Sequence, residues 1–147
     1  MAQNLSERLS EIVKALQLKH GLRVLEIGCG PGAAAREISK ILGNGYILAI
    51  DRSAKAIQQA VAGSQTEIAT GRLGFRHVAV EGFELRENDE LFDIVFAIRV
   101  GALDGRHPEI ETRAFSRIAK VLRKEGRLFV DGGTPLKEIS LEKYRRD

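Results

Sequence analysis

Short apolar runs alternate along the chain with segments whose apolar residues recur every three or four positions. The runs are rich in β-branched and aromatic residues and predict strands, whereas the wider spacing predicts amphipathic helices. The predicted strands are residues 23–27, 46–50, 75–80, 92–98 and 127–130. The predicted helices are residues 4–18 with Asn4 or Ser6 as cap, 33–42, 54–61 with a continuation at 65–69, and 108–122.

This order of elements predicts an α/β fold, a doubly wound and mainly parallel sheet of about five strands with helices on both faces. Residues 81–91 are barely enough for a crossover, so a long loop or a single helical turn is expected there. Ligands of such sheets bind at the carboxyl ends of the strands. Function is therefore sought after Ile27, Ile50, Val80, Ile98 and Val130.

The composition is that of an ordinary folded chain. Its 147 residues suit one domain, residues 1–147, with an N-terminal helix (1–21), a core (22–131) and a tail (132–147). Apolar residues at 44% and charged residues at 29% exclude wholesale disorder. No apolar run reaches the ~18 residues of a membrane span, and the N-terminus lacks a secretory pattern. A cytoplasmic protein without a membrane partner is expected.

Cysteine and charge narrow the function classes further. The single Cys29 allows no internal disulfide and no multi-cysteine zinc site, and no metal is predicted. The net charge of +3 comes from 23 basic residues interleaved with 20 acidic ones, and there is no Trp. Because nucleic-acid surfaces show clustered cations and aromatic platforms, a nucleic-acid partner is not indicated.

Two features carry candidate chemistry. The first is Glu26-Ile27-Gly28-Cys29-Gly30-Pro31-Gly32, three alternate glycines between a strand and a helix. Such a loop lets a ligand approach the backbone and the helix N-terminus. The alternative is a plain strand–helix turn, which would need only one or two glycines. The second is Asp51, 23 residues after Gly28 at the end of the next strand. Alone it would be a capping residue, but after such a loop an acid commonly accepts bonds from a ribose diol.

With these residues the chain resembles the class I S-adenosylmethionine-dependent methyltransferases from about residue 22 to residue 130. Glu26-x-Gly28-x-Gly30-x-Gly32 resembles the first motif of that family, and Asp51 resembles the second. Residues 80–85, 92–96 and 121–128 are similar to three later segments in order and spacing. The resemblance implies a Rossmann-like sheet with strand order 3-2-1-4-5.

The resemblance also implies a cofactor, S-adenosylmethionine, with S-adenosylhomocysteine as product. Gly28, Cys29, Gly30, Pro31 and Gly32 would lie under its methionine and ribose. Glu26 would act near the methionine amine, and Asp51 would hold the ribose with Arg52 beside the adenine. Glu81 would face the adenine amino group and Gly82 and Phe83 would flank the ring. Ile98 and Arg99 would close the pocket.

Several positions depart from the family pattern. Val80 and Glu81 replace a Gly-Asp pair, and Glu125 and Arg127 stand where Pro and Gly are usual. About 17 residues follow strand five, so the usual C-terminal antiparallel hairpin is expected to be missing. Strand five would then be an open edge, covered by a short tail helix around Leu136, Ile139 and Tyr144 or by a second subunit in a homodimer.

Gly28-x-Gly30-x-x-Ala33 also satisfies the NAD fingerprint. Gly32 is superfluous for that interpretation, and Glu26 would repel a pyrophosphate. An NAD-dependent oxidoreductase therefore stays a distant alternative. A nearer alternative is a protein that binds S-adenosylmethionine without catalysis, because fold alone does not decide activity.

The sequence identifies the methyl acceptor poorly. The acceptor is expected beyond strand four, over residues 99–107, and a small molecule is favoured because no Asn/Asp-Pro-Pro-aromatic motif is present. Asp104 and His107 are candidate bases, although His107 also suits an exposed position before a helix. Arg99 and Arg106 could bind an anionic substrate. Cys29 is expected to pack rather than react, although a helix dipole could lower its pKa.

Overall fold

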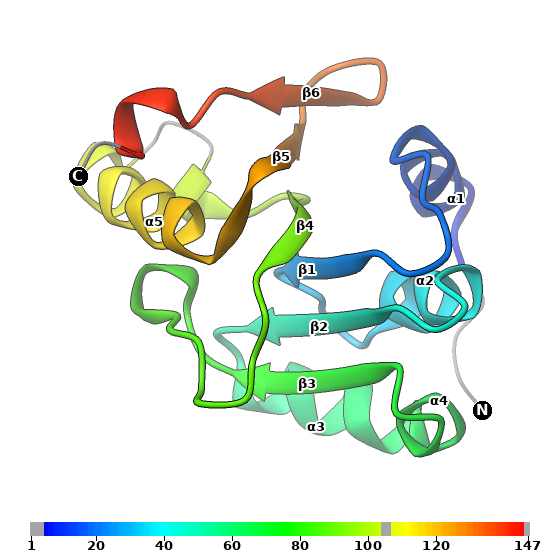
Figure 1. The fold of residues 1–147 in the computed structure, drawn as a ribbon. Coiled ribbons are helices and arrows are strands. Elements are labelled where there is room, and N and C mark those ends of the chain that lie inside the picture. The colour runs from blue at the N-terminus through cyan, green and yellow to red at the C-terminus, as the bar shows by residue number, and fades with distance from the viewer. Residues whose placement is uncertain (1–4, 104–106, 146–147) are drawn as a thin grey trace.

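The computed structural model describes residues 5–103 and 107–145, in which a six-stranded sheet lies between helices (Figure 1). The strands are β1 (Arg23–Ile27), β2 (Tyr46–Asp51), β3 (Leu73–His77), β4 (Phe92–Ala97), β5 (Leu122–Asp131) and β6 (Leu136–Ile139). The α-helices are α1 (Glu7–Ala15), α2 (Ala33–Ile41), α3 (Ala54–Ala62), α4 (Gln65–Ala69) and α5 (Pro108–Val121). Short 3₁₀ helices are η1 (Val80–Gly82), η2 (Gly101–Leu103) and η3 (Glu142–Tyr144).

The sheet has the order β3-β2-β1-β4-β5-β6, and its first five strands are parallel. The predicted α/β fold and the order of those five strands are confirmed. The register places Ile27 at the end of β1 beside Ile50 of β2 and Ala97 of β4. The loops that follow these three strands therefore meet at one edge of the sheet, with β1 in the centre.

The C-terminal tail corrects a prediction. It forms strand β6 and the short η3, whereas a missing hairpin and a tail helix were expected. Asp131 pairs with Leu136 and Leu128 with Ile139 in an antiparallel ladder, and Arg127 forms an ion pair with Glu138 across it at 2.7 Å. The four residues of β6 have weak intrinsic strand preference, so pairing with β5 decides their conformation. Because β6 pairs with residues 128–131 of β5, this part of the edge is not open, and the argument for a dimer from an uncovered fifth strand does not apply to it.

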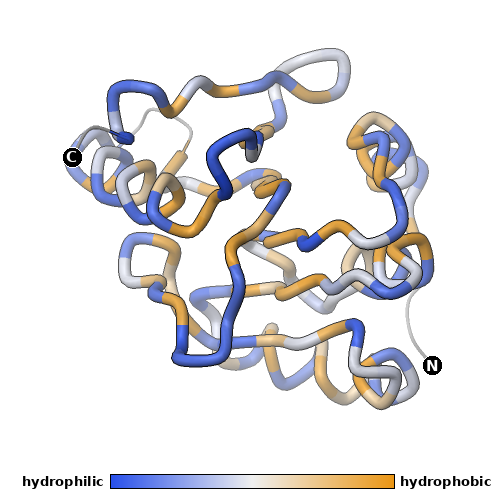
Figure 2. Tube along the Cα trace, viewed as in Figure 1, coloured by the Kyte–Doolittle hydropathy of each residue, from blue (hydrophilic) through white to orange (hydrophobic). Residues whose placement is uncertain are grey.

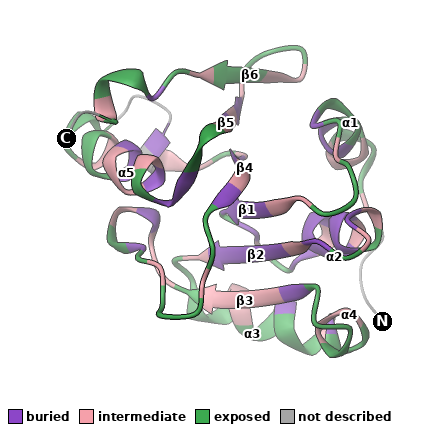
Figure 3. Cartoon of the chain, viewed as in Figure 1, coloured by how far each residue is buried: buried purple, intermediate pink, exposed green. Residues whose placement is uncertain are grey.

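The two faces of the sheet are covered by different elements. Leu25 and Ile27 of β1 belong to the apolar cluster that includes α5 and η1, whereas Val24 belongs to the cluster that includes α1 and α2. Alternation along the strand therefore directs Glu26 to the α1 and α2 side. Figure 2 shows the apolar segments gathered on β1, β2 and β4, and Figure 3 shows that these segments are the buried ones.

The third strand is shifted from its predicted position. β3 starts at Leu73, which pairs with Ile47, and ends at His77, so the chain leaves the sheet before Val80. The start of the strand was not predicted because Gly74 interrupts the apolar pattern. A glycine is needed at this position, since a Cβ there would collide with the Tyr46 hydroxyl. The connection to β4 contains the single turn η1, as predicted.

An ion pair fixes this connection. Both guanidinium amino groups of Arg76 donate to the Asp89 carboxylate, at 2.7 and 2.8 Å, and both side chains are largely buried. The hydrogen bonds lower the pKa of Asp89 and raise that of Arg76. The pair holds the segment that follows β3 against the end of the strand.

The N-terminal helix is shorter than predicted. α1 begins at Glu7 because the Ser6 hydroxyl caps it, accepting from the backbone N–H of Leu9 at 3.2 Å. The other candidate cap, Asn4, lies outside the described residues. Across residues 5–103 and 107–145, none of the helices combines the length and apolarity needed to cross a membrane.

Candidate cofactor and active site

The glycine loop follows the edge of the sheet closely. The backbone N–H groups of Gly28 and Cys29 donate to the carbonyl of Ile50, at 2.8 and 3.1 Å, which ties the loop to β2. Gly28 has a φ of +79°, and a Cβ there would lie 2.8 Å from a methyl of Val100. Only glycine combines this conformation with this approach of the chain that follows β4.

The far end of the loop is fixed by a residue that the sequence analysis missed. Arg36 of α2 is buried, and its guanidinium donates to the carbonyl of Pro31 at 2.8 Å and to the Ser64 hydroxyl at 3.0 Å. Gly32 has a φ of +90°, and a Cβ there would lie 3.1 Å from that guanidinium. An arginine in the alanine-rich start of a helix is the signal that could have identified this anchor.

Asp51 lies at the end of β2 with its carboxylate fixed. One oxygen accepts from the Gly30 N–H at 2.9 Å, and the other accepts from the Ser53 N–H at 2.9 Å. A carboxylate has about four acceptor positions, so these two bonds leave capacity on both oxygens. Asp51 therefore holds the glycine loop while it can still accept from a bound hydroxyl.

Glu26 is a buried acid with an unsatisfied oxygen. Only 5% of the residue is exposed, and its Oε1 has no hydrogen-bond partner among the described residues. Burial, with a contribution from the negative charge of Asp51, raises the pKa of Glu26 to about 8. A buried polar atom without a partner is costly, and a cationic donor from a ligand would remove that cost.

Two cavities flank the glycine loop. The Asp51 cavity holds about 200 Å³, and its wall continues through Arg52 and residues 78–81. The Glu26 cavity holds about 320 Å³, and part of its wall is formed by Arg8 and Leu9 of α1 and by the capping residue Ser6. Both are lined by Gly28 and Arg99, so they meet where β1 and β4 end. An elongated ligand could occupy both.

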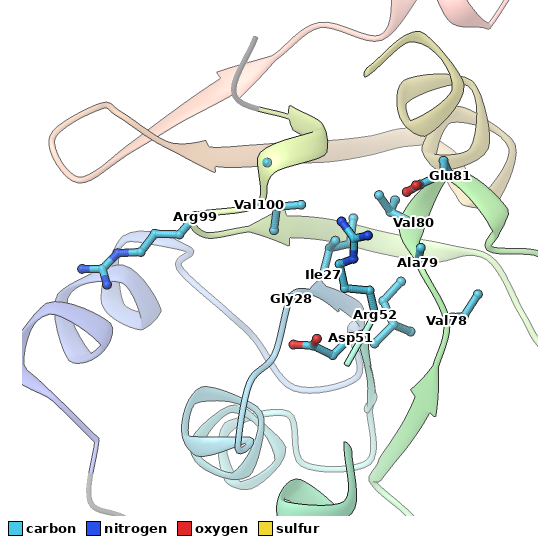
Figure 4. Close-up of a pocket in the computed structure, with 12 residues that line it drawn as sticks. Ile27, Gly28, Asp51, Arg52, Val78, Ala79, Val80, Glu81, Arg99 and Val100 are labelled. Carbon is cyan, nitrogen blue, oxygen red and sulfur yellow. The ribbon is translucent and has the colours of Figure 1, made fainter. Parts of the chain in front are cut away.

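Arg99 stands between the two cavities in an uncommon conformation. Its φ is +58°, and its backbone N–H donates to the Asp131 carboxylate at 3.3 Å. The same carboxylate forms an ion pair with Arg8 at 3.3 Å. Figure 4 shows the Arg99 side chain extending away from Asp51 toward α1, whereas Val100 points into the Asp51 cavity. Left-handed backbone at a non-glycine residue is typical of functional sites.

Most predicted cofactor residues line these cavities. The Asp51 cavity is lined by Gly28, Asp51, Arg52, Glu81 and Arg99, and the Glu26 cavity by Glu26, Gly28, Cys29, Gly30, Pro31, Ile98 and Arg99. Gly32 and Gly82 line neither. The lining residues that the sequence analysis did not assign to the cofactor include Val78, Ala79 and Val80 in the first wall and Ser6, Arg8 and Leu9 in the second. No sequence signal links α1 to the loop, because that contact is tertiary.

Phe83, which was predicted beside the adenine, lines neither cavity. The residue is 2% exposed and packs in the core, with its ring 6.5 Å from that of Phe92. The turn of η1 directs Phe83 inward and leaves Val80 and Glu81 at the cavity.

Of the two candidate bases, Asp104 and His107, only His107 lies within the described residues. Asp104, like Arg106, lies outside the described residues. His107 is exposed, precedes α5 without forming a side-chain cap, and lines neither cavity. Within the described part of the chain, no three His, Cys, Asp or Glu side chains are grouped to hold a metal ion.

Cys29 is buried in the loop, and its thiol lies 3.5 Å from the Gly30 carbonyl. Burial and the nearby charges of Glu26 and Asp51 raise the pKa of the thiol, which is the opposite of the lowering that a helix dipole alone would cause. We expect iodoacetamide to alkylate Cys29 at least about a hundredfold more slowly in the folded protein than in urea. Mass spectrometry over time measures both rates, and equal rates would contradict the buried position.

Fold and site together define a doubly wound α/β domain in which a glycine loop and an acid at the end of the second strand face adjoining cavities. Residues 24–126 match the methyltransferase domain family, and the chain belongs to that family. The resemblance drawn from the loop and Asp51 is thereby confirmed at the level of the family.

Individual relatives agree with this assignment. A probable cobalt-precorrin-6B C(15)-methyltransferase (decarboxylating) of Thermoplasma acidophilum is 29% identical over 79% of this chain and 53% of its own. The O-methyltransferase rstn1 of Aspergillus nomiae is 30% identical over 91% of this chain and 59% of its own. The chain thus spans between half and three fifths of the length of these two curated relatives.

The fold also matches solved structures. A methyltransferase of Thiobacillus denitrificans in complex with S-adenosylhomocysteine superposes with a TM-score of 0.67, at 23% identity, over 86% of this chain and 48% of the other. At this identity the likeness concerns the fold.

Proposed function

We propose that this chain binds S-adenosylmethionine and transfers its methyl group to a small-molecule acceptor. The observation that carries the proposal is the unpartnered Oε1 of Glu26, buried in a cavity that the glycine loop lines. Membership of the methyltransferase family supports it, as does the product bound to the Thiobacillus denitrificans neighbour.

The residues present fit this cofactor. Glu26 would accept from the methionine ammonium, which supplies the cation that its buried oxygen lacks. Asp51 would accept from the ribose hydroxyls with the capacity that its two backbone bonds leave free. The apolar wall of Val78, Ala79 and Val80 would cover one side of the adenine.

When bound, S-adenosylmethionine supplies a methyl group on a positively charged sulfur, which a lone pair of the acceptor displaces in line. The contribution of the chain is alignment and the exclusion of water, and these effects supply much of the rate of such reactions. α1 would shield the Glu26 cavity, where Arg8 is held by Asp131. A base is required only where the acceptor must lose a proton.

The acceptor site is proposed at the end of β4, beyond Val100. A third cavity of about 550 Å³ lies there between β5, β6 and α5, and it shares Val100 with the Asp51 cavity. We call it the Lys137 cavity. Its volume is that of ordinary small-molecule sites, which supports a small-molecule acceptor.

Calorimetric titration of the purified chain with S-adenosylhomocysteine, with NAD as control, tests the proposal. We expect the first ligand alone to bind, with a dissociation constant on the order of micromolar. Binding of NAD instead would support the dinucleotide interpretation. If the folded protein bound neither, the proposal would be wrong, and binding without transfer to any acceptor would leave the non-catalytic alternative.

A further inference from the structure

The Lys137 cavity combines an apolar floor with charged side chains. Its apolar lining comes from β4, η2, α5, β5, β6 and η3 and consists of Ala97, Val100, Leu103, Phe115, Val130, Ile139 and Tyr144. The rings of Phe115 and Tyr144 pack against each other with centroids 5.4 Å apart. Aromatic rings with aliphatic neighbours favour a flat apolar body in the ligand.

Two cations stand on the side of this cavity formed by the C-terminal tail. Lys137 is directly opposite Val130 in the β5–β6 ladder, and Lys143 places its ammonium 5.1 Å from the centre of the Tyr144 ring. Both lysines are exposed, and no salt bridge joins either of them to a described acid. Their ammonium groups are available to an anion of a ligand.

Two acids also line the cavity, and they do not cancel this charge. Asp131 is committed to Arg8 and to the backbone of Arg99. Glu111 lies on α5, one turn before Phe115, and among the described residues no salt bridge joins it to either lysine. With Asp131 paired to Arg8, the two lysines outnumber the one remaining acid, so the lining carries a net positive charge.

We propose that the Lys137 cavity binds an acceptor with a ring-sized apolar body and an anionic group, and that Lys137 and Lys143 select for the anion. This inference rests on the proposed function for the term acceptor, because the cavity adjoins the Asp51 cavity at Val100. The apolar body lies over Phe115 and Tyr144. The anion, a carboxylate in the simplest case, lies toward β6 and η3.

Matched pairs of ring acids and their carboxamides test the selection. 4-Hydroxycinnamate, phenylacetate and cyclohexylacetate are titrated, each beside its amide, into the protein saturated with S-adenosylhomocysteine. We expect at least one acid to bind about tenfold more tightly than its amide, and this preference to shrink as salt rises to about 0.5 M. Equal binding of acid and amide in every pair would overturn the proposal.

Variants locate the effect. In the double variant Lys137→Met, Lys143→Met, which keeps the apolar stems, the preference for the acid should fall to within about twofold. Lys120→Met, which removes an exposed lysine of α5 outside the cavity lining, should keep it. A preference that survives the double variant would overturn the assignment to these lysines. Thermal unfolding verifies that each variant is folded.

The design separates two failures. If S-adenosylhomocysteine binds and no acid is preferred, the acceptor class is wrong while the cofactor assignment stands. If S-adenosylhomocysteine does not bind, the acids are titrated into the protein alone. A lysine-dependent preference there would retain the anion site and remove the methyltransferase function.

Discussion

Replacement of Asp51 by alanine is expected to weaken binding of S-adenosylhomocysteine by about tenfold to a hundredfold. The estimate corresponds to the loss of charge-assisted hydrogen bonds worth about 1–3 kcal/mol. The variant also frees the N–H groups of Gly30 and Ser53, which the carboxylate holds at 2.9 Å. The glycine loop then keeps its bonds from Gly28 and Cys29 to Ile50 but loses the bond from Gly30 to β2. Titration calorimetry at constant pH measures the change.

A ribose-modified ligand distinguishes the contact from the loop effect. The 2′,3′-dideoxy analogue of S-adenosylhomocysteine should bind the wild type much more weakly, whereas Asp51→Ala should hardly discriminate the two ligands. Asp93→Ala is the matched control, because that carboxylate also accepts from a backbone N–H, of Arg23 at 2.8 Å, but at the amino end of β4. Unchanged affinity in Asp51→Ala would refute the ribose contact.

Glu26→Gln is expected to act in opposite directions on affinity and stability. A neutral amide cannot pair with the methionine ammonium, so binding at about pH 8 should weaken by about tenfold or more. In the wild type, affinity should fall by up to about tenfold per pH unit as the pH drops below the Glu26 pKa of about 8, because binding needs the ionised acid. In the variant this dependence should vanish. Titrations between about pH 6 and pH 9 test both statements.

The stability of the ligand-free protein has the opposite sign. The pKa of Glu26 is raised in the folded state, from 4.5 to about 8, so the folded chain keeps a proton that the unfolded chain has lost. The contribution of Glu26 to stability is therefore complete below about pH 4.5 and is lost as the pH rises toward 8. Glu26→Gln should remove this decline, whereas Glu37→Gln on the exposed side of α2 should keep it. A wild type without the decline would contradict the buried position of Glu26.

Local chemistry explains what the sequence could predict. The glycine loop follows β1 directly and Asp51 is the last residue of β2, so their positions depend on neighbouring residues and on the parallel order of the sheet. β6 was missed because its conformation depends on pairing with β5. The burial of Phe83 was not foreseen, because the direction of a side chain after η1 depends on the core that receives it, here the ring of Phe92.

The Lys137 cavity could not be predicted from the sequence either. Val100, Phe115 and Lys137 come from three distant parts of the chain and meet only in the folded protein. No spacing of residues in the sequence predicts such a site. The unpartnered oxygen of Glu26 was likewise invisible, because its burial depends on α1 and α2 closing over the strand.

One carboxylate serves two parts of the proposed ligand. The Asp51 carboxylate that would receive the ribose hydroxyls also holds the Gly30 N–H, and Gly30 lines the cavity proposed for the methionine end. Occupation of either half therefore constrains the loop that the other half needs. Adenosine and methionine, offered as separate fragments, would be linked by positive cooperativity, and by thermodynamic reciprocity each would favour the other to the same degree.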